Sequence, residues 1–259
     1  MDIILGAIAG DIIGSCYEFK WNIPKDFILF NEISKYTDDT VLTIAILDSL
    51  LNNDSENSEQ YLKRYAKNYP NSGFGPGFIN WVLQPSGVQN NSFGNGAAMR
   101  VSAVGALAKN EETLLKWIQE VTVPSHNHIE AIKGATAIAM VIYKAKNGHS
   151  KKDIHKYVTK DLGYDLNIDF EKFRDRQIPE FICQTTVPFA IACFLESNDY
   201  ESCIRLAVSL GGDTDTVACM AGGIAAAFYG GIPLFIKQEV IQRLPDAFKV
   251  ILGQSILTS

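Results

Sequence analysis

Apolar residues recur at helical spacing along most of this chain. In the run VLTIAILDSLL, which ends at residue 51, Val41, Ile44 and Ala45 fall at positions i, i+3 and i+4. This is the spacing that places apolar side chains on one face of an α-helix. The run follows directly on the polar stretch Thr-Asp-Asp-Thr at 37–40. We therefore predict a helix that begins at an acidic turn and buries its apolar face.

A second segment, IEAIKGATAIAMVIYKAK at 129–146, has the same periodicity. Asn127 and Glu130 stand at the spacing of a capping box, and the pair Asn147–Gly148 predicts the end of the helix. Similar patterns predict helices at 99–109, 111–121, 150–161, 186–196, 199–209, 216–229 and 234–243.

Alternating strand patterns are hard to find, and the short runs FILF at 27–30 and TVPF at 186–189 are ambiguous. We therefore expect an all-α fold, with residues 1–259 forming one domain. The polar run at 52–59 is interpreted as a surface connection. Two long stretches, 15–36 and 70–96, are predicted to be non-helical, and connections of this length are more often functional than idle.

The composition is that of a folded globular protein, with 47% hydrophobic and 20% charged residues. The net charge of −6 and the lack of a basic cluster disfavour an extended nucleic-acid partner. A small ligand with two phosphates is not excluded, because local dipoles can hold it.

The cysteines are odd in number and lack CxxC spacing, so we interpret them as reduced core residues. The N-terminus has no basic region of the kind that opens a signal peptide. The most apolar run, 217–236, is interrupted by two glycine pairs and a proline, which disfavours a membrane span. We expect a cytoplasmic protein that acts without a membrane, as a monomer.

Two short turns carry pairs of carboxylates beside threonines: Thr-Asp-Asp-Thr at 37–40 and Asp-Thr-Asp-Thr at 213–216. One interpretation is helix capping, because Asp and Thr are favoured at helix starts. Capping needs only one side chain, however, and neither turn contains a Lys or Arg to offset the cost of burying acids. A metal is the natural counter-ion.

The four aspartates carry four negative charges, which two divalent cations would balance. Oxygen-only ligands, including threonine hydroxyls, favour hard ions such as Mg²⁺ or Mn²⁺. Acid clusters with a purely structural role remain the alternative, and metal-dependent thermal stabilisation would separate the two.

Three further features are ambiguous when taken alone. Gly94 and Gly96 open a turn that we expect to run into a helix near Ala97, where N–H groups could hold an anion, although a simple glycine-rich loop has the same appearance. His126, near a predicted helix start, is typical of a cap or a surface residue. Glu18, in a loop, is typical of a solvated side chain.

Five segments in order resemble the motifs of the ADP-ribosylglycohydrolase family, from residue 6 to about residue 230. They are GAIAGDIIGSCYEF, YTDDTVLTIAIL, SFGNGAAMRVSAVG, SHNHIEAIKGA and LGGDTDTVACMAGGIAAAFYG. The resemblance implies an all-helical fold with a dinuclear Mg²⁺ or Mn²⁺ site at the base of a cleft. The metal ligands that it implies are Thr37, Asp38, Asp39, Asp213, Asp215 and Thr216.

The same resemblance assigns the glycine-rich turn to the diphosphate and distal ribose of ADP-ribose, through Ser92, Phe93, Gly94, Asn95 and Gly96. Gly75 is expected to line the same cleft. His126 is expected to contact the ligand, although Ser125 replaces the threonine that the family has before it. Glu18 is expected to act on the reacting water or ribose, and Asp11 to support the site from behind without being a ligand.

The implied reaction is hydrolysis of the bond that joins C1″ of ADP-ribose to a modified side chain, with an ADP-ribosylated protein or conjugate as substrate. Two rival functions remain open. A dinuclear phosphoesterase would release phosphate or AMP from a nucleotide. A non-catalytic module would bind ADP-ribose without cleaving it.

Overall fold

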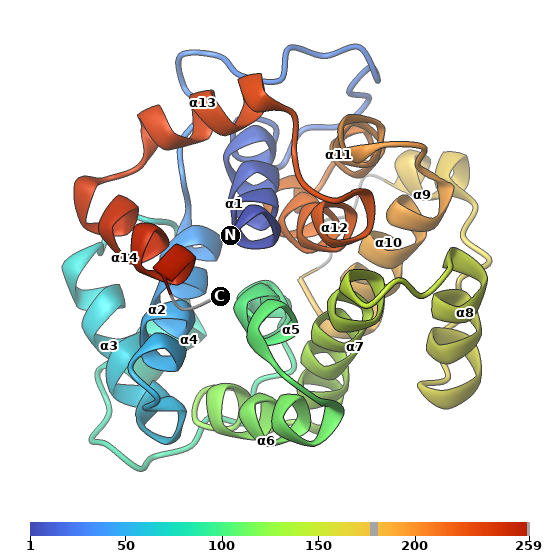
Figure 1. Cartoon of the computed structure of the whole chain (residues 1–259). Helices are drawn as coiled ribbons and strands as arrows, with labels where there is room; N and C mark the ends of the chain where they lie inside the picture. Colours follow the sequence, from blue (N-terminus) through green and yellow to red (C-terminus); the bar gives the residue numbers. More distant parts are fainter. Residues whose placement is uncertain (177–180, 258–259) are drawn as a thin grey trace.

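The computed structural model describes residues 1–176 and 181–257, which form helices joined by loops (Figure 1). Within these ranges extended pairing is limited to two isolated bridges, which confirms the all-α prediction. The elements are α1 (Asp2–Ser15), α2 (Asp38–Leu51), η1 (Ser55–Asn57), α3 (Ser58–Asn68), α4 (Pro76–Val82), η2 (Asn95–Ala97), α5 (Ser102–Leu107), α6 (Glu111–Thr122), α7 (Ile129–Lys146), α8 (Lys151–Lys156), η3 (Tyr157–Asp161), α9 (Phe170–Arg176), α10 (Cys183–Glu196), α11 (Tyr200–Ser209), α12 (Thr214–Tyr229), α13 (Leu234–Arg243) and α14 (Asp246–Leu257).

Helices α1 and α12 lie next to each other in the middle of the molecule (Figure 1). Glycines on α1 lie directly against the backbone or the small side chains of α12. A Cβ atom added at Gly10 would lie 2.0 Å from the carbonyl oxygen of Ala218, and one added at Gly6 would lie 2.4 Å from the Cβ of Ala226. The close approach therefore depends on missing side chains.

This contact gives the first prediction. Gly10→Ala should lower the free energy of unfolding by about 2 kcal/mol, because the added methyl group forces the two helices apart. Gly253 provides a matched control, since it lies in α14 with open space around its Cα atom. Gly253→Ala should leave stability unchanged or raise it by up to about 1 kcal/mol through helix propensity. Urea unfolding curves of the two variants check this, and equal stabilities would contradict the packing argument.

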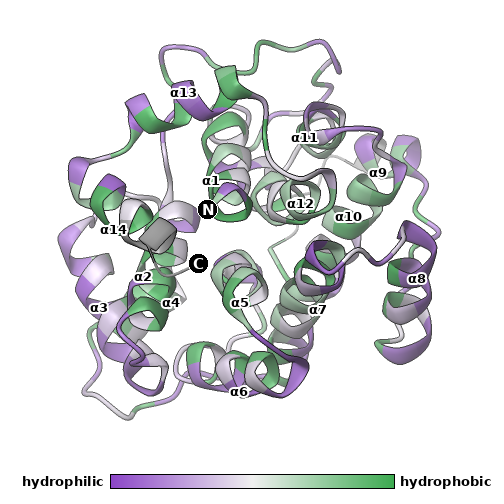
Figure 2. Ribbon diagram, in the orientation of Figure 1, coloured by the Kyte–Doolittle hydropathy of each residue, from purple (hydrophilic) through white to green (hydrophobic). Residues whose placement is uncertain are grey.

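The remaining helices surround this pair, and α12 also contacts α7, α10 and α11. Apolar residues concentrate toward the middle, whereas peripheral helices such as α8 turn hydrophilic residues outward (Figure 2). None of the helices in the described ranges has the length and apolarity that a membrane span needs. The prediction of reduced core cysteines is confirmed, because all of them are free and buried: Cys16, Cys183, Cys193, Cys203 and Cys219.

Helix α7 has the predicted bounds, but its predicted cap is wrong. The N-cap residue is His128, whose Nδ1 accepts a hydrogen bond from the backbone N–H of Glu130. Asn127 instead donates its side-chain amide to Gln89. Asn127 and His128 are neighbours in the sequence. The hydrogen bond of Asn127 to Gln89 in the neighbouring loop keeps its side chain from capping the helix.

Three other predictions need correction. Residues 70–96 are not wholly non-helical, because Pro76 begins the short helix α4. The polar run 52–59 is more than a connection, since η1 lies within it and α3 begins at Ser58. The helix expected at 99–109 is shorter, and α5 begins only at Ser102. The stretch between α1 and α2, in contrast, has no helix, as predicted.

Candidate metal centre and ligand cleft

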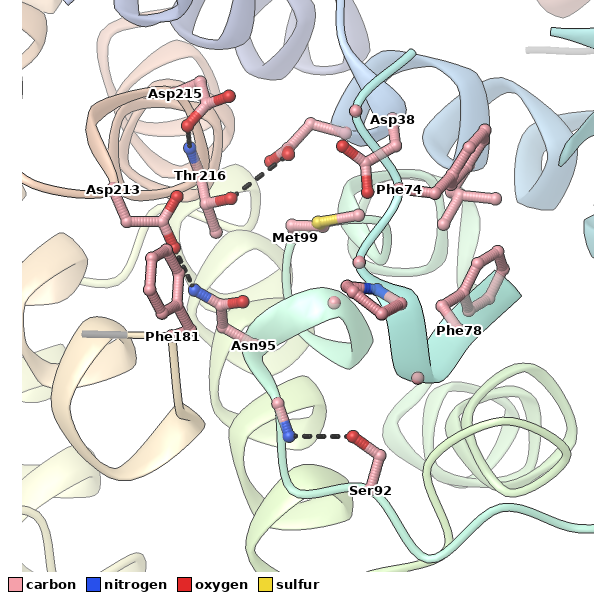
Figure 3. Close-up of a pocket in the computed structure, with 18 of the residues that line it drawn as sticks. Asp38, Phe74, Phe78, Ser92, Asn95, Met99, Phe181, Asp213, Asp215 and Thr216 are labelled. Carbon is pink, nitrogen blue, oxygen red and sulfur yellow. Dashed lines mark hydrogen bonds between the residues drawn. The ribbon is translucent and has the colours of Figure 1, made fainter. Parts of the chain in front are cut away.

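A cavity of about 490 Å³ opens between the start of α12, the start of α2 and the loops around α4 and η2 (Figure 3). It brings together residues from seven separate stretches of the sequence. Of the residues singled out from the sequence, those that line it are Glu18, Asp38, Asp39, Gly75, Ser92, Gly94, Asn95, Gly96, His126, Asp213, Asp215 and Thr216.

Thr37 and Phe93 are outside this lining. Thr37 is buried just behind it, at the N-cap of α2. Phe93 is partly exposed and its ring packs against His128, with ring centroids 5.3 Å apart. Its backbone carbonyl accepts from the N–H of Cys183, so Phe93 helps to hold the glycine-rich turn in place.

The start of α2 is capped without the help of Asp38 or Asp39. Asp11 of α1 accepts hydrogen bonds from the backbone N–H groups of Thr37 and Thr40, each at 3.0 Å, and from both threonine hydroxyls. Thr37 in turn accepts from the N–H of Asp39. Since Asp11 and Thr37 do the capping, helix capping does not explain the acid pair that follows them.

The start of α12 is held by two glycines with positive φ, Gly211 at 76° and Gly212 at 77°. A Cβ atom at Gly211 would lie 2.6 Å from the carbonyl oxygen of Lys20. Gly212 exchanges backbone hydrogen bonds with this loop, because it accepts from Phe19 at 2.8 Å and donates to Lys20 at 3.2 Å. The tight turn thus docks the loop that carries Glu18 onto the second acidic turn.

The two acidic turns face each other across the base of the cavity (Figure 3). The Thr216 hydroxyl donates to Asp39 Oδ2 at 3.1 Å, which joins one turn to the other. Asn95 Nδ2 donates to Asp213 Oδ2 at 2.5 Å. Carboxylate oxygens of Glu18, Asp213 and Asp215 all lie within 4.8 Å of one another.

Burial strongly perturbs these acids. It raises the pKa of Asp38 to about 8, helped by the negative charge of Asp11, and it raises the pKa of Asp39 and Asp215 well above their usual range. The pKa of Glu18 rises to about 7, first through burial and then through the charge of Asp213. These carboxylates are therefore in an environment that disfavours their charged forms.

The donor set fits a hard divalent cation. Among the described residues, none of the five cavity carboxylates forms an ion pair with Lys, Arg or His. Asp39 Oδ1 is buried without a hydrogen-bond partner. Clustered acids without cationic neighbours, offering only oxygen ligands, are typical of a Mg²⁺ or Mn²⁺ site.

A dependence of stability on pH follows from these pKa values. Unfolded carboxyls titrate near pH 4, whereas Glu18 and Asp38 titrate at about 7 and about 8 in the fold. The folded state binds more protons in this window, so the stability of the metal-free protein should fall as pH rises from about 4 to about 8.

Melting temperatures measured in EDTA between pH 4 and pH 8 check how the stability of the metal-free protein changes with pH. Asp38→Asn should weaken this pH dependence, because the amide cannot ionise. Added Mn²⁺ should weaken it in the wild type. A metal-free melting temperature that rises steadily through the window would contradict the assignment.

The glycine-rich turn differs from the prediction. The helix expected near Ala97 is absent, and the turn contains only the three-residue η2. The N–H of Gly94 donates to Ser92 Oγ at 3.1 Å, and the N–H of Asn95 donates to the carbonyl of Phe181. Two donors that a helix start would have offered to an anion are therefore already engaged.

Aromatic residues in the cavity lining were missed by the sequence reasoning. Phe74 and Phe78 stack with ring centroids 5.5 Å apart on one side (Figure 3). Phe19 and Phe181 pair edge to face at 5.9 Å on another. The alternation of Gly and Phe in GFGPGF was a usable signal for the first pair. No local pattern indicates the second, because its members are far apart in sequence.

The comparisons with known proteins agree with this arrangement. The family model for ADP-ribosylglycohydrolase matches residues 1–256. Human ADP-ribosylhydrolase ARH3 is 26% identical over an alignment that covers 88% of this chain and 84% of the human protein. ADP-ribosylarginine hydrolase Tri1 of Pseudomonas putida is 25% identical, with 89% of this chain and 71% of that protein covered. A solved structure described as an ADP-ribosylglycohydrolase-related protein complex superposes with a TM-score of 0.70 at 22% identity, over 97% of this chain and 96% of that one.

The all-α fold with an acid-lined cleft is thus that of a hydrolase. The chain belongs to the ADP-ribosylglycohydrolase family, a metal-dependent family of enzymes that act on ADP-ribose linkages. The resemblance seen in the sequence is confirmed.

Proposed function

We propose that this cleft binds an ADP-ribosylated side chain with the scissile C1″ bond at the carboxylates and releases ADP-ribose. The observation that carries the proposal is the set of five acids that line the cavity, of which Asp39, Asp213 and Asp215 are buried. None of the five forms an ion pair with Lys, Arg or His within the described residues. The whole chain, residues 1–259, acts as one domain in this proposal.

Two divalent cations, Mg²⁺ or Mn²⁺, complete the site. The residues that would hold them are Thr37, Asp38, Asp39, Asp213, Asp215 and Thr216. When bound, the cations would orient the ribose hydroxyls and lower the pKa of the attacking water. The Thr37 hydroxyl donates its proton to Asp11 at 2.7 Å and accepts from the N–H of Asp39, which leaves one oxygen lone pair that could bind a cation.

The chain's own residues prepare the hydrolysis. The bond between C1″ and the side-chain nitrogen or oxygen breaks, and positive charge that develops at C1″ is stabilised by the surrounding carboxylates. Water supplies the hydroxyl that joins C1″, and its proton is transferred to the leaving side chain. Glu18, whose pKa of about 7 suits proton transfer near neutral pH, is the base that we propose for this water.

The part of the cavity that the glycine-rich turn lines would hold the diphosphate, where Ser92, Gly94 and Gly96 leave room for it. Gly94→Val should weaken ADP-ribose binding by roughly 10-fold or more, because its branched side chain would enter the cavity, and tenfold corresponds to about 1.4 kcal/mol. Metal affinity should stay within about 2-fold, since Gly94 has no contact with the acids. Calorimetry measures both constants, and unchanged ADP-ribose affinity would place the phosphates elsewhere.

The leaving side chain distinguishes members of this activity class. Human ARH3 is named an ADP-ribosylhydrolase and Tri1 an ADP-ribosylarginine hydrolase. Peptides that carry ADP-ribose on arginine or on serine should be incubated with Mg²⁺ or Mn²⁺ and the products identified by mass spectrometry. Free ADP-ribose and an unmodified peptide are expected from at least one of them. Release of AMP or phosphate would favour the phosphoesterase, and binding without any product would favour the non-catalytic module.

The monomeric state and the cytoplasmic location stay predictions from the sequence. Light scattering of the purified protein and microscopy of a tagged chain would test them.

A further inference from the structure

Arg100 is buried completely, directly after the glycine-rich turn. Its Nη2 donates to the carbonyl oxygen of Val121 at 2.9 Å and to Ser125 Oγ at 2.7 Å. No carboxylate in the described structure pairs with it, and its Nε and Nη1 have no hydrogen-bond partner there. A buried, unpaired cation is costly, which indicates that this guanidinium has a role beyond packing.

Ser125 connects Arg100 to His126. The Ser125 side chain is buried completely, and its Oγ lies 2.8 Å from His126 Nδ1. Because an arginine can only donate, Ser125 Oγ accepts from Arg100, and its own hydroxyl proton needs an acceptor. His126 Nδ1 is the remaining hydrogen-bond partner of this hydroxyl in the described structure. Nδ1 therefore accepts, and in a neutral imidazole the ring proton must then lie on Nε2.

The Nε2 edge of His126 faces the end of the cavity that the glycine-rich turn forms. A Cβ atom added at Gly96 would lie 3.3 Å from Nε2, and one added at Gly94 would lie 3.8 Å from it. All three residues line the cavity. Because the N–H groups of Gly94 and Asn95 are engaged elsewhere, the His126 Nε2–H is a donor that this end of the cavity can offer to a ligand.

We propose that Arg100 and Ser125 are positioning residues that lock His126 in its Nε2–H tautomer, so that it donates a fixed hydrogen bond to a phosphate oxygen of the ligand. This inference rests on the proposed function for the identity of the ligand, but the tautomer itself does not. Burial lowers the pKa of His126 well below its usual range, and the charge of Arg100 lowers it further. The ring is thus kept neutral beside an anion-binding end, and its orientation is set from behind.

Nitrogen NMR of the imidazole rings in the ligand-free protein tests the tautomer directly, with the His126 signal assigned by its loss in His126→Gln. At pH 7 we expect a protonated Nε2 and an unprotonated, hydrogen-bonded Nδ1. A protonated Nδ1, or a doubly protonated ring, would overturn the inference.

Ser125→Ala removes the hydroxyl, and Ser125→Thr is the matched control that keeps it. Ser125→Ala should give a mixture of tautomers and weaken ADP-ribose binding about 10-fold, whereas Ser125→Thr should keep the Nε2–H tautomer and an affinity within about 2-fold. Unchanged affinity and spectrum in Ser125→Ala would overturn the inference.

If a variant does not fold, the wild-type spectrum alone decides whether the inferred tautomer is correct. If no ADP-ribosylated peptide is cleaved, the proposed function fails while the tautomer can still be as inferred.

Discussion

Asp213→Asn is expected to abolish most metal binding and to lower turnover by roughly 10²-fold or more, since even the supporting residues of metal sites cost 10- to 100-fold when removed. The substitution keeps the size of the side chain and its contact with Asn95, because the amide oxygen can still accept the hydrogen bond. It removes one of the buried negative charges that we propose to balance two cations.

The same variant should be more stable than the wild type in EDTA. Burial raises the pKa of Asp213, so its charged form is disfavoured by the fold, and a neutral isostere relieves that cost. Asp246→Asn is the control, because Asp246 also stands at the start of a helix, but its side chain is 95% exposed and its ion pair with Lys249 lies on the surface. It should leave metal affinity and turnover unchanged. Wild-type turnover in Asp213→Asn would contradict the metal-ligand assignment.

Glu18→Gln is expected to lower turnover by roughly 10²–10⁴, the range for general acid–base groups. Gln keeps the reach of the side chain and removes its basicity. The loop that carries Glu18 is held by its backbone hydrogen bonds to Gly212, so the fold should not change. Metal binding should persist in weaker form, because the Glu18 carboxylate lies close to those of Asp213 and Asp215.

Glu32→Gln provides the matched control for this experiment, since Glu32 lies on the same connecting segment and is exposed. Metal affinity, melting temperature and turnover should be measured for both variants. Near-normal turnover in Glu18→Gln would return Glu18 to the role of a solvated loop residue. Complete loss of metal binding would instead make it a ligand.

Much of the helical fold could be predicted from local patterns. The apolar periodicity at 129–146 and 234–243 gives the bounds of α7 and α13, because residues that end or begin helices flank these runs: Asn147 caps the end of α7 and Pro233 the start of α13. Helix α3 was not predicted, because polar and charged residues outnumber the few apolar ones, such as Leu62, Tyr65 and Ala66, that form its buried face. Helix α4 was missed because its glycine and proline neighbours suggest a loop, whereas Pro76 in fact begins the helix.

The acidic turns of the site were also visible in the sequence, since two carboxylates without a basic neighbour need an explanation. The residues that hold those turns in place could not be identified from the sequence. Asp11 caps α2 from another helix, and no local pattern pairs it with Thr40. Arg100 and Ser125 meet only because α6 returns the chain to the glycine-rich turn. Supporting contacts of this kind depend on tertiary structure, so sequence spacing alone cannot reveal them.

The most direct test of the account is anomalous diffraction from a crystal grown with Mn²⁺ and ADP-ribose. The account predicts two manganese peaks between the acidic turn at 37–39 and the one at 213–216, with the terminal ribose beside them and Glu18 within reach of its C1″. A single peak, peaks away from these carboxylates, or a terminal ribose whose C1″ lies away from them would contradict it.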